Sequence, residues 1–504
     1  MFLLRNAQIF DGNGGDAFHG DLLIDGDRIA ALGSFDAPPG TPSIDLHGLA
    51  LAPGFIDLHS HSDAKLLDGD PAKTLQGVTA ELVGNCGFST FPHCDCPEDV
   101  GAYNDGILCD RRTFSSAAEF LSATRKPTVL AHVETLVGHG TLRTAALSCN
   151  PELRSEALTE ELCRLLNLAL NEGAAGFSSG LMYAPGATAP HKELVALCKV
   201  VSQHNKLYAT HMRSYSWELE AAVEEQLALA RESGCRLQIS HLQAAGQANW
   251  HRQRNALDAI ETAHAEGIDV AFDAYPYLAG STVLSQLLPQ DFWEHGFRTY
   301  QKKIASKAMR SELVEWLKTH TAQRWTDIHI SAHAALTEGD NLTGQTVAEY
   351  AEERKLDPAE AVLDLIERTA GQINIVAFNQ SEENLRELLT HPLSCVISDG
   401  LYSRGMPHPR LYGSFVSLLG YYVRQLNWLS LPQAIHKITG FPANRLGLLD
   451  RGRLSVDCLA DIVCFDAATI GSPSTYAIPH ANPTGIHFVY RNGVQILPSV
   501  QPAG

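Results

Sequence analysis

A repeating unit dominates the middle of this 504-residue chain and narrows its fold class. Each unit is an amphipathic helical stretch, followed by a Gly or Asn and then by a short β-branched or aromatic run. A repeat of roughly 30 residues has the length of a right-handed βαβ crossover, so the strands are expected to be parallel. The pattern predicts an α/β protein with a (β/α)8 TIM-like barrel. The clearest units are SEALTEELCRLLNLALNEG–AAGFSSGLMY, HKELVALCKVVSQHN–KLYATHMR, SWELEAAVEEQLALARESG–CRLQISHL and ANWHRQRNALDAIETAHAEG–IDVAFDAYPY.

Eight short apolar runs can supply the strands of this barrel, within a domain expected at residues 51–447. Between the seventh and eighth runs lie roughly 110 residues, too many for a loop in a compact domain. This stretch has helical and strand patterns of its own, and it predicts an inserted subdomain or lid at residues 285–390. The predicted strands are 54–59, 79–84, 128–133, 175–179, 207–211, 236–241, 269–274 and 395–399.

Both ends of the chain alternate short strands with tight turns. Arg491-Asn492-Gly493, for example, offers a hairpin turn between two apolar runs. Residues 1–50 and 448–504 are therefore predicted to form one small β-sandwich domain. Two independent edge hairpins are the alternative.

The composition excludes several classes of partner. A formal net charge of −19 argues against binding nucleic acid or an anionic membrane, since both need a basic surface. No run approaches the about 18 apolar residues of a membrane helix, and the amino-terminal segment does not have the pattern of a secretory signal. Eleven cysteines, an odd number spread through apolar patterns, are typical of a reducing compartment. We expect a cytoplasmic protein with a small-molecule substrate, and its oligomeric state stays open.

Six side chains that can bind a metal follow the apolar, β-like runs. In a barrel of alternating strands and helices, the carboxyl ends of different strands meet at one face and build the active site. Imidazole, thiolate and carboxylate together suit zinc better than magnesium or calcium, which prefer oxygen ligands. The pattern predicts a zinc hydrolase. The six candidate ligands are His59, His61, Cys86, His211, His241 and Asp399.

Two of these candidates, Cys86 and Asp399, also have an ordinary structural interpretation. Cys86 could be a buried packing cysteine, although its Gly and Asn neighbours favour an exposed turn at a strand end. Asp399 could cap the following loop, whereas in a zinc site it would take a proton from the attacking water and return it to the leaving amine. Cys94 and Cys96, in HCDCP, fit either a secondary metal or redox feature or an ordinary loop.

Together these motifs resemble the amidohydrolase superfamily, and within it the D-aminoacylase (N-acyl-D-amino-acid deacylase) family. The resemblance extends over nearly the whole chain, with the segments in the expected order. It implies a (β/α)8 barrel with a β-sandwich from both termini and an insertion near the last strands. The matching segments are PGFIDLHSHSD, QGVTAELVGNCG, LVGHGTLR, GAAGFSSGLMYAPG, ATHMRS, ISHLQAAG, DAYPYLAGST, SDG, PHPRLYGSF and TGFPANRLGLLDRGRL.

The resemblance also implies roles for the metal ligands. Cys86, His211 and His241 would hold one tightly bound Zn²⁺. His59 and His61 would form a second, weaker metal position. Asp399, itself counted among the metal-site residues, would be the general base and acid.

Further residues would bind the substrate. Tyr275, Ser281 and Arg410 match positions that bind the α-carboxylate in relatives. His139, in the GHG turn, would orient the scissile carbonyl group, with a plain turn histidine as the alternative. The implied reaction is hydrolysis of N-acyl-D-amino acids or related linear N-acyl compounds. A cyclic amide or a D-residue dipeptide is the alternative substrate, and a non-catalytic protein on the same scaffold is a third possibility.

Two departures from the family pattern bear on the substrate. Gln243 stands two residues after the histidine of the sixth strand, where many relatives have a lysine that pairs with the substrate carboxylate. An amide supplies no charge there, so roughly 1.5–3 kcal/mol of a charge-assisted bond is lost. Relatives often carry a glutamate in the segment where this chain has Ser214 and Tyr215.

Overall fold

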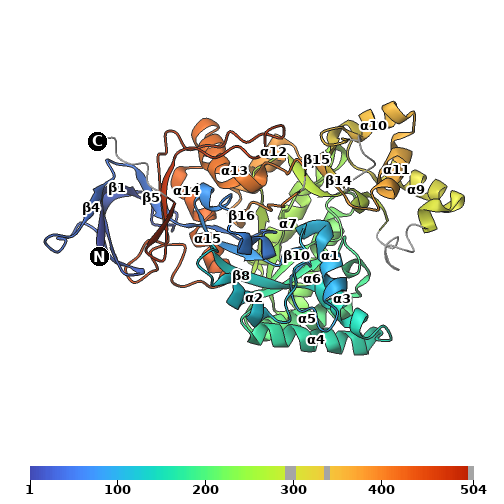
Figure 1. Ribbon diagram of the computed structural model, residues 1–504, viewed down its shortest axis with the longest axis horizontal. Coiled ribbons are helices and arrows are strands. Elements are labelled where there is room, and N and C mark those ends of the chain that lie inside the picture. Colours follow the sequence, from blue (N-terminus) through green and yellow to red (C-terminus); the bar gives the residue numbers. More distant parts are fainter. Residues whose placement is uncertain (290–301, 334–340, 404, 498–504) are drawn as a thin grey trace.

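The computed structural model describes residues 1–289, 302–333, 341–403 and 405–497. At its centre is a sheet of eight parallel strands in the order β16-β12-β11-β10-β9-β8-β7-β6. The predicted (β/α)8 barrel is confirmed, and Figure 1 shows its position between two smaller units. The strands are β6 (Phe55–Asp57), β7 (Val78–Val83), β8 (His132–Gly138), β9 (Gly176–Gly180), β10 (Leu207–His211), β11 (Arg236–Ile239), β12 (Val270–Ala274) and β16 (Ser394–Val396).

The barrel closes between its first and last strands just beyond their regular pairing. The Asp399 backbone N–H donates to the His59 carbonyl at 2.9 Å, and the His61 N–H donates to the Gly400 carbonyl at 3.2 Å. Ser60 and Gly400 form a parallel bridge between the same segments. The closing seam therefore places the HSH motif directly beside Asp399.

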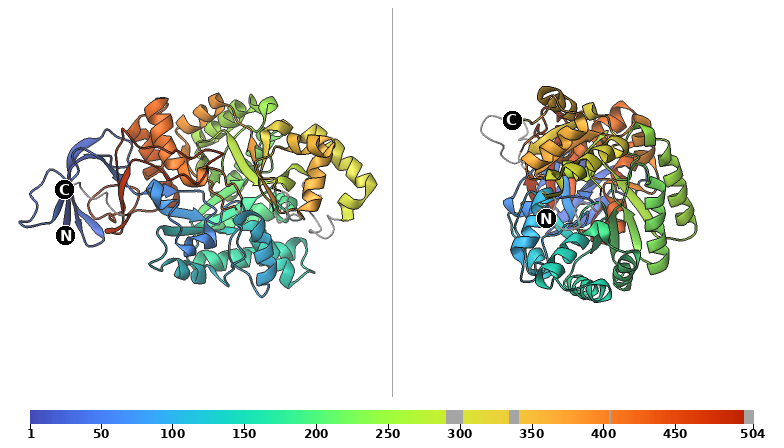
Figure 2. Two further views of the ribbon diagram at one scale, coloured as in Figure 1. Left: turned by 45° about the horizontal axis from the view of Figure 1, so that its top comes forward. Right: turned by 90° about the vertical axis from the view of Figure 1, so that its right-hand side faces the viewer.

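Amphipathic helices cover the outside of the barrel, as the end-on view in Figure 2 shows. In each helix, apolar residues three and four positions apart form the buried face, because 3.6 residues make one turn. Leu158, Leu162, Leu165 and Leu166 of α4 are an example of this spacing. The main covering helices are α3 (His139–Cys149), α4 (Ser155–Asn171), α5 (His191–Gln203), α6 (Leu219–Ser233), α7 (Arg252–Ala265) and α12 (Glu382–Thr390).

One strand differs from its predicted position. The third strand was expected at 128–133, but β8 spans His132–Gly138. The carbonyls of Val129 and Ala131 accept hydrogen bonds from Arg491 Nη1, at 2.6 and 2.9 Å, instead of joining the barrel ladder. An apolar run can thus precede a strand without belonging to it.

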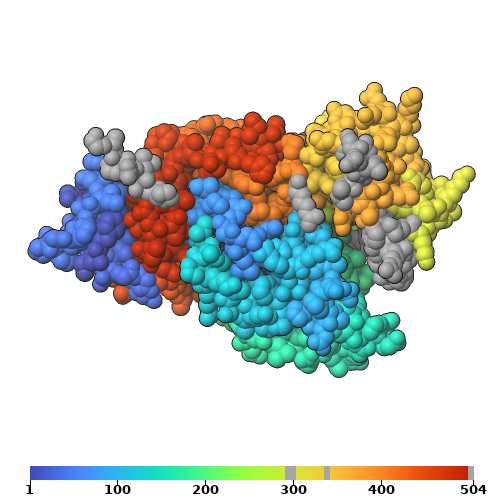
Figure 3. All heavy atoms as spheres, in the orientation of Figure 1, coloured from blue at the N-terminus to red at the C-terminus, as the bar shows by residue number. Residues whose placement is uncertain are grey.

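The two ends of the chain meet in a second sheet, at the left of Figures 1 and 3. Its order is β19-β18-β17-β5-β1-β2-β3, with β4 paired to β1. Apolar residues from both ends share one core, including Leu4, Leu22, Ile462 and Phe488. The small β domain built from both termini is confirmed. Its strands are β1 (Phe2–Ile9), β2 (Phe18–Asp25), β3 (Arg28–Gly33), β4 (Ser43–Asp45), β5 (Ala50–Pro53), β17 (Ile462–Phe465), β18 (Ile486–Arg491) and β19 (Val494–Leu497).

An insertion with its own core follows β12, at the right of Figure 1. A three-stranded antiparallel sheet, β13-β15-β14, packs with helices α9, α10 and α11. The insertion between strands seven and eight is confirmed, and the exact domain boundaries stay a prediction. Residues 290–301 and 334–340 of the expected 285–390 segment lie outside the described residues. The elements are β13 (Ala279–Val283), α9 (Lys307–His320), β14 (Ile328–His333), α10 (Val347–Arg354), α11 (Pro358–Arg368) and β15 (Ile373–Phe378).

Among the described residues, we find no helix with the length and apolar character needed to cross a bilayer.

Candidate metal centre and active site

The six predicted metal ligands meet at the carboxyl end of the barrel. One of them ends β10, and the other five lie in the loops that follow β6, β7, β11 and β16. Each residue is buried, with at most 6% of its surface exposed. Their donor atoms form three overlapping triplets, each with atoms within 4.8 Å of one another: His59–His61–Cys86, Cys86–His211–His241 and His59–His241–Asp399.

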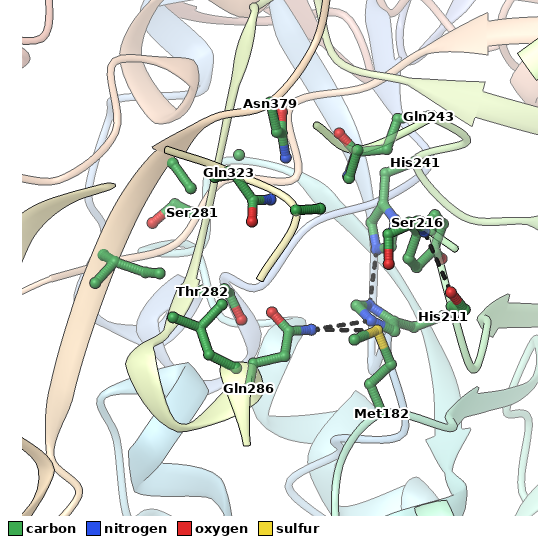
Figure 4. A pocket seen from close by; sticks show the side chains of 18 of the residues that line it. Met182, His211, Ser216, His241, Gln243, Ser281, Thr282, Gln286, Gln323 and Asn379 are labelled. Carbon is green, nitrogen blue, oxygen red and sulfur yellow. Dashed lines mark hydrogen bonds between the residues drawn. The ribbon is translucent and has the colours of Figure 1, made fainter. Parts of the chain in front are cut away.

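The Cys86 thiol lies at the centre of this cluster. Its Sγ atom is 3.3 Å from His59 Nε2 and 3.5 Å from His241 Nε2. His211 Nδ1 is 3.1 Å from His241 Nε2, so the histidines of two successive strands face each other. Figure 4 shows His211 and His241 at the edge of a cavity. Cys86, His59 and His241 each belong to two of the three triplets, so the candidate ligand sets overlap.

The loops that carry the ligands have an unusual backbone. Cys86, His241 and Asp399 all have positive φ angles, of 54°, 36° and 48°. Non-glycine residues rarely adopt this conformation, and it gathers at functional sites because it turns a side chain in a direction that a regular strand cannot. Gly84, just before the cysteine, has φ 79°, and a Cβ atom there would overlap the Leu136 carbonyl oxygen. A glycine at position 84 is thus required by the close approach of the loop after β7 to β8.

The electrostatics of the cluster favour the metal-binding form of the thiol. Burial acts to raise the pKa of Cys86. The positive charge of His59 and the hydrogen bonds from His211 and His241 outweigh burial, and the pKa is held well below its usual value. A thiolate beside imidazoles is a donor set that zinc prefers. The residues present therefore fit this metal.

Asp399 completes the cluster on the side of the HSH motif. Its Oδ1 atom is 3.2 Å from His61 Nε2 and 3.5 Å from His59 Nε2. Its Oδ2 atom is 2.9 Å from Arg410 Nη1. Burial acts to raise the pKa of this carboxyl group, but the charges of Arg410 and His59 hold it well below its usual value. The carboxylate is thus ionised and able to accept a proton.

Two residues that support the ligands were missed from the sequence. Asp273 Oδ1 accepts a hydrogen bond of 2.7 Å from the His241 backbone N–H and lies 3.5 Å from His59 Nδ1. The ring of Tyr215 lies 5.0 Å from that of His211 and 5.1 Å from that of His241. A buried acid within the apolar strand VAFDA is a signal that could have identified Asp273, because such a charge needs a partner.

A buried charge network beneath the seam was missed as well. Lys73 Nζ pairs with Asp57 and lies 3.4 Å from Glu81 Oε2. It also donates to Ser398 Oγ at 2.7 Å and to Ser60 Oγ at 3.1 Å. Ser60 separates the two histidines of the HSH motif, and Ser398 directly precedes the metal-site aspartate. The network therefore joins the loops that carry three candidate ligands.

A cavity of about 830 Å³ opens beside the metal-capable cluster. The barrel loops supply one wall, including Trp217, and the insertion supplies the opposite wall, including Trp316. These walls touch where Trp217 Nε1 donates to the His320 carbonyl at 3.2 Å. Figure 4 shows side chains of both walls around the space. Residues of the insertion thus line the cavity, and a lid role for the insertion stays a prediction.

The four predicted substrate-binding residues all line this cavity and contact one another. The Arg410 guanidinium lies 4.9 Å from the centre of the Tyr275 ring, and its Nη2 donates to the Ser281 carbonyl at 3.2 Å. The Tyr275 hydroxyl donates to Gln243 Oε1 at 3.0 Å. The Gln243 amide N–H₂ group is left as a donor beside the cavity. Their substrate contacts stay a prediction.

His139 does not lie with this group. It begins α3, is fully buried, and is absent from the described residues that line the cavity. Its Nε2 atom is 2.8 Å from Glu193 Oε1, and Glu193 is also paired with Arg143 at 2.6 Å. Burial lowers the pKa of His139 despite this carboxylate. Its predicted action on the scissile carbonyl has no direct contact in this arrangement and stays a prediction.

Three proteins that are similar over nearly the whole of this chain are named as deacylases or an aminoacylase. N-acyl-D-glutamate deacylase from Alcaligenes xylosoxydans xylosoxydans is 34% identical, over 99% of this chain and 94% of that protein. D-aminoacylase from the same organism is 35% identical, over 98% and 94%. Its N-acyl-D-aspartate deacylase is also 35% identical, over 98% and 91%.

Solved structures of deacylases are also similar to this chain. N-acyl-D-glutamate deacylase from Bordetella bronchiseptica, complexed with zinc and a phosphonate that mimics the tetrahedral intermediate, has a TM-score of 0.85 at 32% identity, covering 100% of this chain and 97% of that chain. A D-aminoacylase structure has a TM-score of 0.82 at 31% identity, covering 98% and 96%. The profile described as "Amidohydrolase family" matches residues 43–496. This chain therefore belongs to the amidohydrolase family, and within it to the D-aminoacylases and N-acyl-D-amino-acid deacylases.

Proposed function

We propose that this protein is a zinc-dependent amidohydrolase that cleaves the amide bond of N-acyl-D-amino acids. The observation that carries the proposal is the buried triplet Cys86–His211–His241 with an ionised carboxylate, Asp399, beside it. Three relatives that are similar over nearly the whole chain are named as deacylases or an aminoacylase acting on D-amino acid derivatives. Their names support the same reaction for this protein. A cytoplasmic location stays a prediction.

The proposed metal-binding residues fall into two groups. Cys86, His211 and His241 would hold the tightly bound zinc. His59 and His61 would form the second, weaker position. Zinc in such a site acts as a Lewis acid on a carbonyl oxygen and lowers the pKa of water toward neutrality.

Asp399 moves the proton. Because its carboxylate is ionised, it can accept a proton from the attacking water and then deliver it to the nitrogen of the leaving amine. Its contact with His61 and its ion pair with Arg410 hold it in one orientation. A fixed carboxylate beside the metal ligands suits this transfer, since proton transfer requires hydrogen-bond distance.

We expect the substrate α-carboxylate to bind beside Arg410, Tyr275, Ser281 and Gln243. Arg410 is 1% exposed, and its Nε atom has no hydrogen-bond partner among the described residues. A buried N–H without a partner is costly, so an anionic ligand that approaches this guanidinium would be stabilised. Gln243 adds a neutral donor where a lysine would add a charge. We therefore expect weaker carboxylate binding than in relatives that have the lysine.

Hydrolysis of cyclic amides is the competing function on this fold. Hydantoinase structures match with a TM-score of 0.53 at 16% identity, which shows the fold alone. Sequence similarity over nearly the whole chain is to proteins named for linear N-acyl substrates. Linear amides are therefore the favoured class.

A substrate panel tests the proposal. Zinc-loaded protein is given N-acetyl-D- and N-acetyl-L-amino acids with acidic and apolar side chains, a hydantoin, and a D-residue dipeptide. Amine release is measured for the linear compounds and ring opening for the hydantoin. Faster release from the D enantiomers is expected. Ring opening or dipeptide cleavage without deacylation would contradict the assigned substrate, and inactivity toward every compound would contradict the assigned reaction.

A further inference from the structure

Three thiols gather outside the active site, at the outer ends of two neighbouring helices. Cys96 directly precedes α1 (Pro97–Leu108), and Cys149 is the last residue of α3. Their Sγ atoms lie 3.1 Å apart, although the residues are 53 positions apart in the sequence. Cys94 is the third thiol, and it interacts electrostatically with Cys149. Two sulfurs at this separation need only a small movement to reach disulfide bonding distance, about 2.05 Å.

The pair is accessible to small molecules. Cys149 is exposed and Cys96 is partly exposed, whereas Cys86 of the metal centre is buried. Figure 1 shows α1 and α3 side by side at the edge of the barrel. The helices run in opposite directions, because Tyr103 of α1 contacts Gly140 near the start of α3. Thus the thiols lie at one end of the helix pair, and Ile107, which lines the cavity, lies toward the other.

We propose that Cys96 and Cys149 form a reversible disulfide bond when the protein meets a low-molecular-weight disulfide. The Cys149 thiolate attacks one sulfur of the small disulfide, forming a mixed disulfide and releasing one small thiolate. This thiolate takes the proton of Cys96, and the Cys96 sulfur then attacks Cys149 Sγ, forming the internal bond and releasing the second small thiolate. Two protein thiols are oxidised and one small disulfide is reduced to two thiols, so atoms and electrons balance.

The arrangement of the protons fits this order. The hydrogen bond with Cys149 raises the pKa of Cys96 to about 11, so Cys96 keeps its proton and donates it toward the Cys149 sulfur. Cys149 is exposed, so it is the thiol of the pair that an external disulfide reaches first. Burial raises the pKa of Cys94 to about 11, and this half-buried thiol is the slower competitor.

The bond would fasten α1 to α3 without changing the metal centre. Both helices continue inward, α1 to the cavity wall at Ile107 and α3 from the buried His139. A cross-link that closes a 53-residue separation restricts the unfolded chain, so the oxidised protein should melt at a higher temperature. Turnover should persist, because the sulfurs move at the ends of the helices that point away from the cavity.

Thiol titration and peptide mapping test the inference on the full-length, zinc-loaded protein. After incubation with oxidised glutathione, we expect two thiols to be lost, a Cys96–Cys149 linked peptide, a raised Tm and retained turnover, all reversed by dithiothreitol. In Cys149→Ser, oxidised glutathione should oxidise no thiol to an internal disulfide, and Tm should not rise. Cys94→Ser is the matched control, and it should still form the bond.

Other outcomes would overturn the inference. These are a Cys94–Cys149 link in the wild-type protein, glutathione that stays attached to Cys149, a disulfide between two copies of the chain, or no loss of thiols. Zinc bound by these thiols would also overturn it, and it would appear as zinc that Cys149→Ser loses while its activity is unchanged. None of these results depends on the substrate assignment.

Discussion

At the residue scale, three of the candidate ligands combine buried, metal-binding side chains with a constrained backbone. Asp399 has a left-handed backbone conformation and is held between His61 and Arg410. Asp399→Asn keeps the shape of the side chain but removes its ability to take a proton. We expect turnover to fall by about 10² to 10⁴, the usual size of a lost general base, while zinc content and Tm change little. Steady-state kinetics and metal analysis check this, and near-normal turnover would assign the proton transfer to another group.

Gln243 is the residue that should set the affinity for anionic substrates. In Gln243→Lys, an ammonium group would replace the amide beside Tyr275 and Arg410. We expect KM for N-acyl-D-amino acids to fall by roughly 10- to 100-fold, the value of a charge-assisted bond of about 1.5–3 kcal/mol. The gain should shrink as salt rises, because salt screens charges. Gln243→Met, which adds no charge, is the control. An equal effect of both variants would exclude electrostatics as the cause.

The metal-site residues could be predicted from the sequence because each of them follows an apolar run. Cys86 and His241 could be identified because their chemistry stands out at a strand end. The acid in VAFDA marks Asp273 as a buried charge, but its partners could not be predicted, since they come from the loop after another strand and from a backbone N–H group. The interaction of His139 with Glu193 was equally invisible, because it joins two helices 54 positions apart. Contacts that depend on three-dimensional pairing leave no local pattern.

At the element scale, helix α14 (Leu431–Lys437) is fastened to the start of β16 by one buried amine. Lys437 Nζ donates to the Ser394 carbonyl at 2.9 Å and to Ser394 Oγ at 2.8 Å. Burial lowers the pKa of this lysine to about 8, from an ordinary value of 10.5. Between these two values the unfolded chain binds the proton and the folded protein does not. The free energy of unfolding contributed by this group therefore rises with pH across that window.

The variant Lys437→Met should lack this contribution. From pH 8 to about 10.5, we expect the wild-type free energy of unfolding to gain about 3 kcal/mol relative to the variant. Urea unfolding of both zinc-loaded proteins at several pH values measures this difference, and groups common to both proteins cancel. A constant difference across the window would show that the lysine stays charged in the folded protein.

Elements were predicted well where their pattern was regular and poorly at their edges. The helices α4 to α7 show clear apolar spacing, and the strands after them follow a Gly or Asn. The strand at 54–59 is shorter than expected, because β6 ends at Asp57 and the HSH motif belongs to the closing seam. The shift of β8 has the same origin, since apolar content alone does not show which backbone groups join a ladder.

At the scale of the whole molecule, two of the three units form the site. The barrel supplies the ligands, the insertion supplies one wall of the cavity, and the sheet from both termini packs at the opposite end (Figures 1 and 2). The size of the insertion could be predicted from the gap between two strands. The contact by which it meets the barrel loops could not, because Trp217 and His320 are 103 positions apart in the sequence.

The central claim is that Cys86 is a zinc ligand of a D-specific deacylase. The most direct test measures zinc content and turnover of an N-acetyl-D-amino acid for Cys86→Ala beside Cys198→Ala, which removes a buried thiol from the core face of α5. We predict that Cys86→Ala loses most of its zinc and more than about 100-fold of its activity, because even residues that only orient a ligand cost about 10- to 100-fold when changed. Cys198→Ala should keep both. Full zinc occupancy and normal turnover in Cys86→Ala would contradict the account.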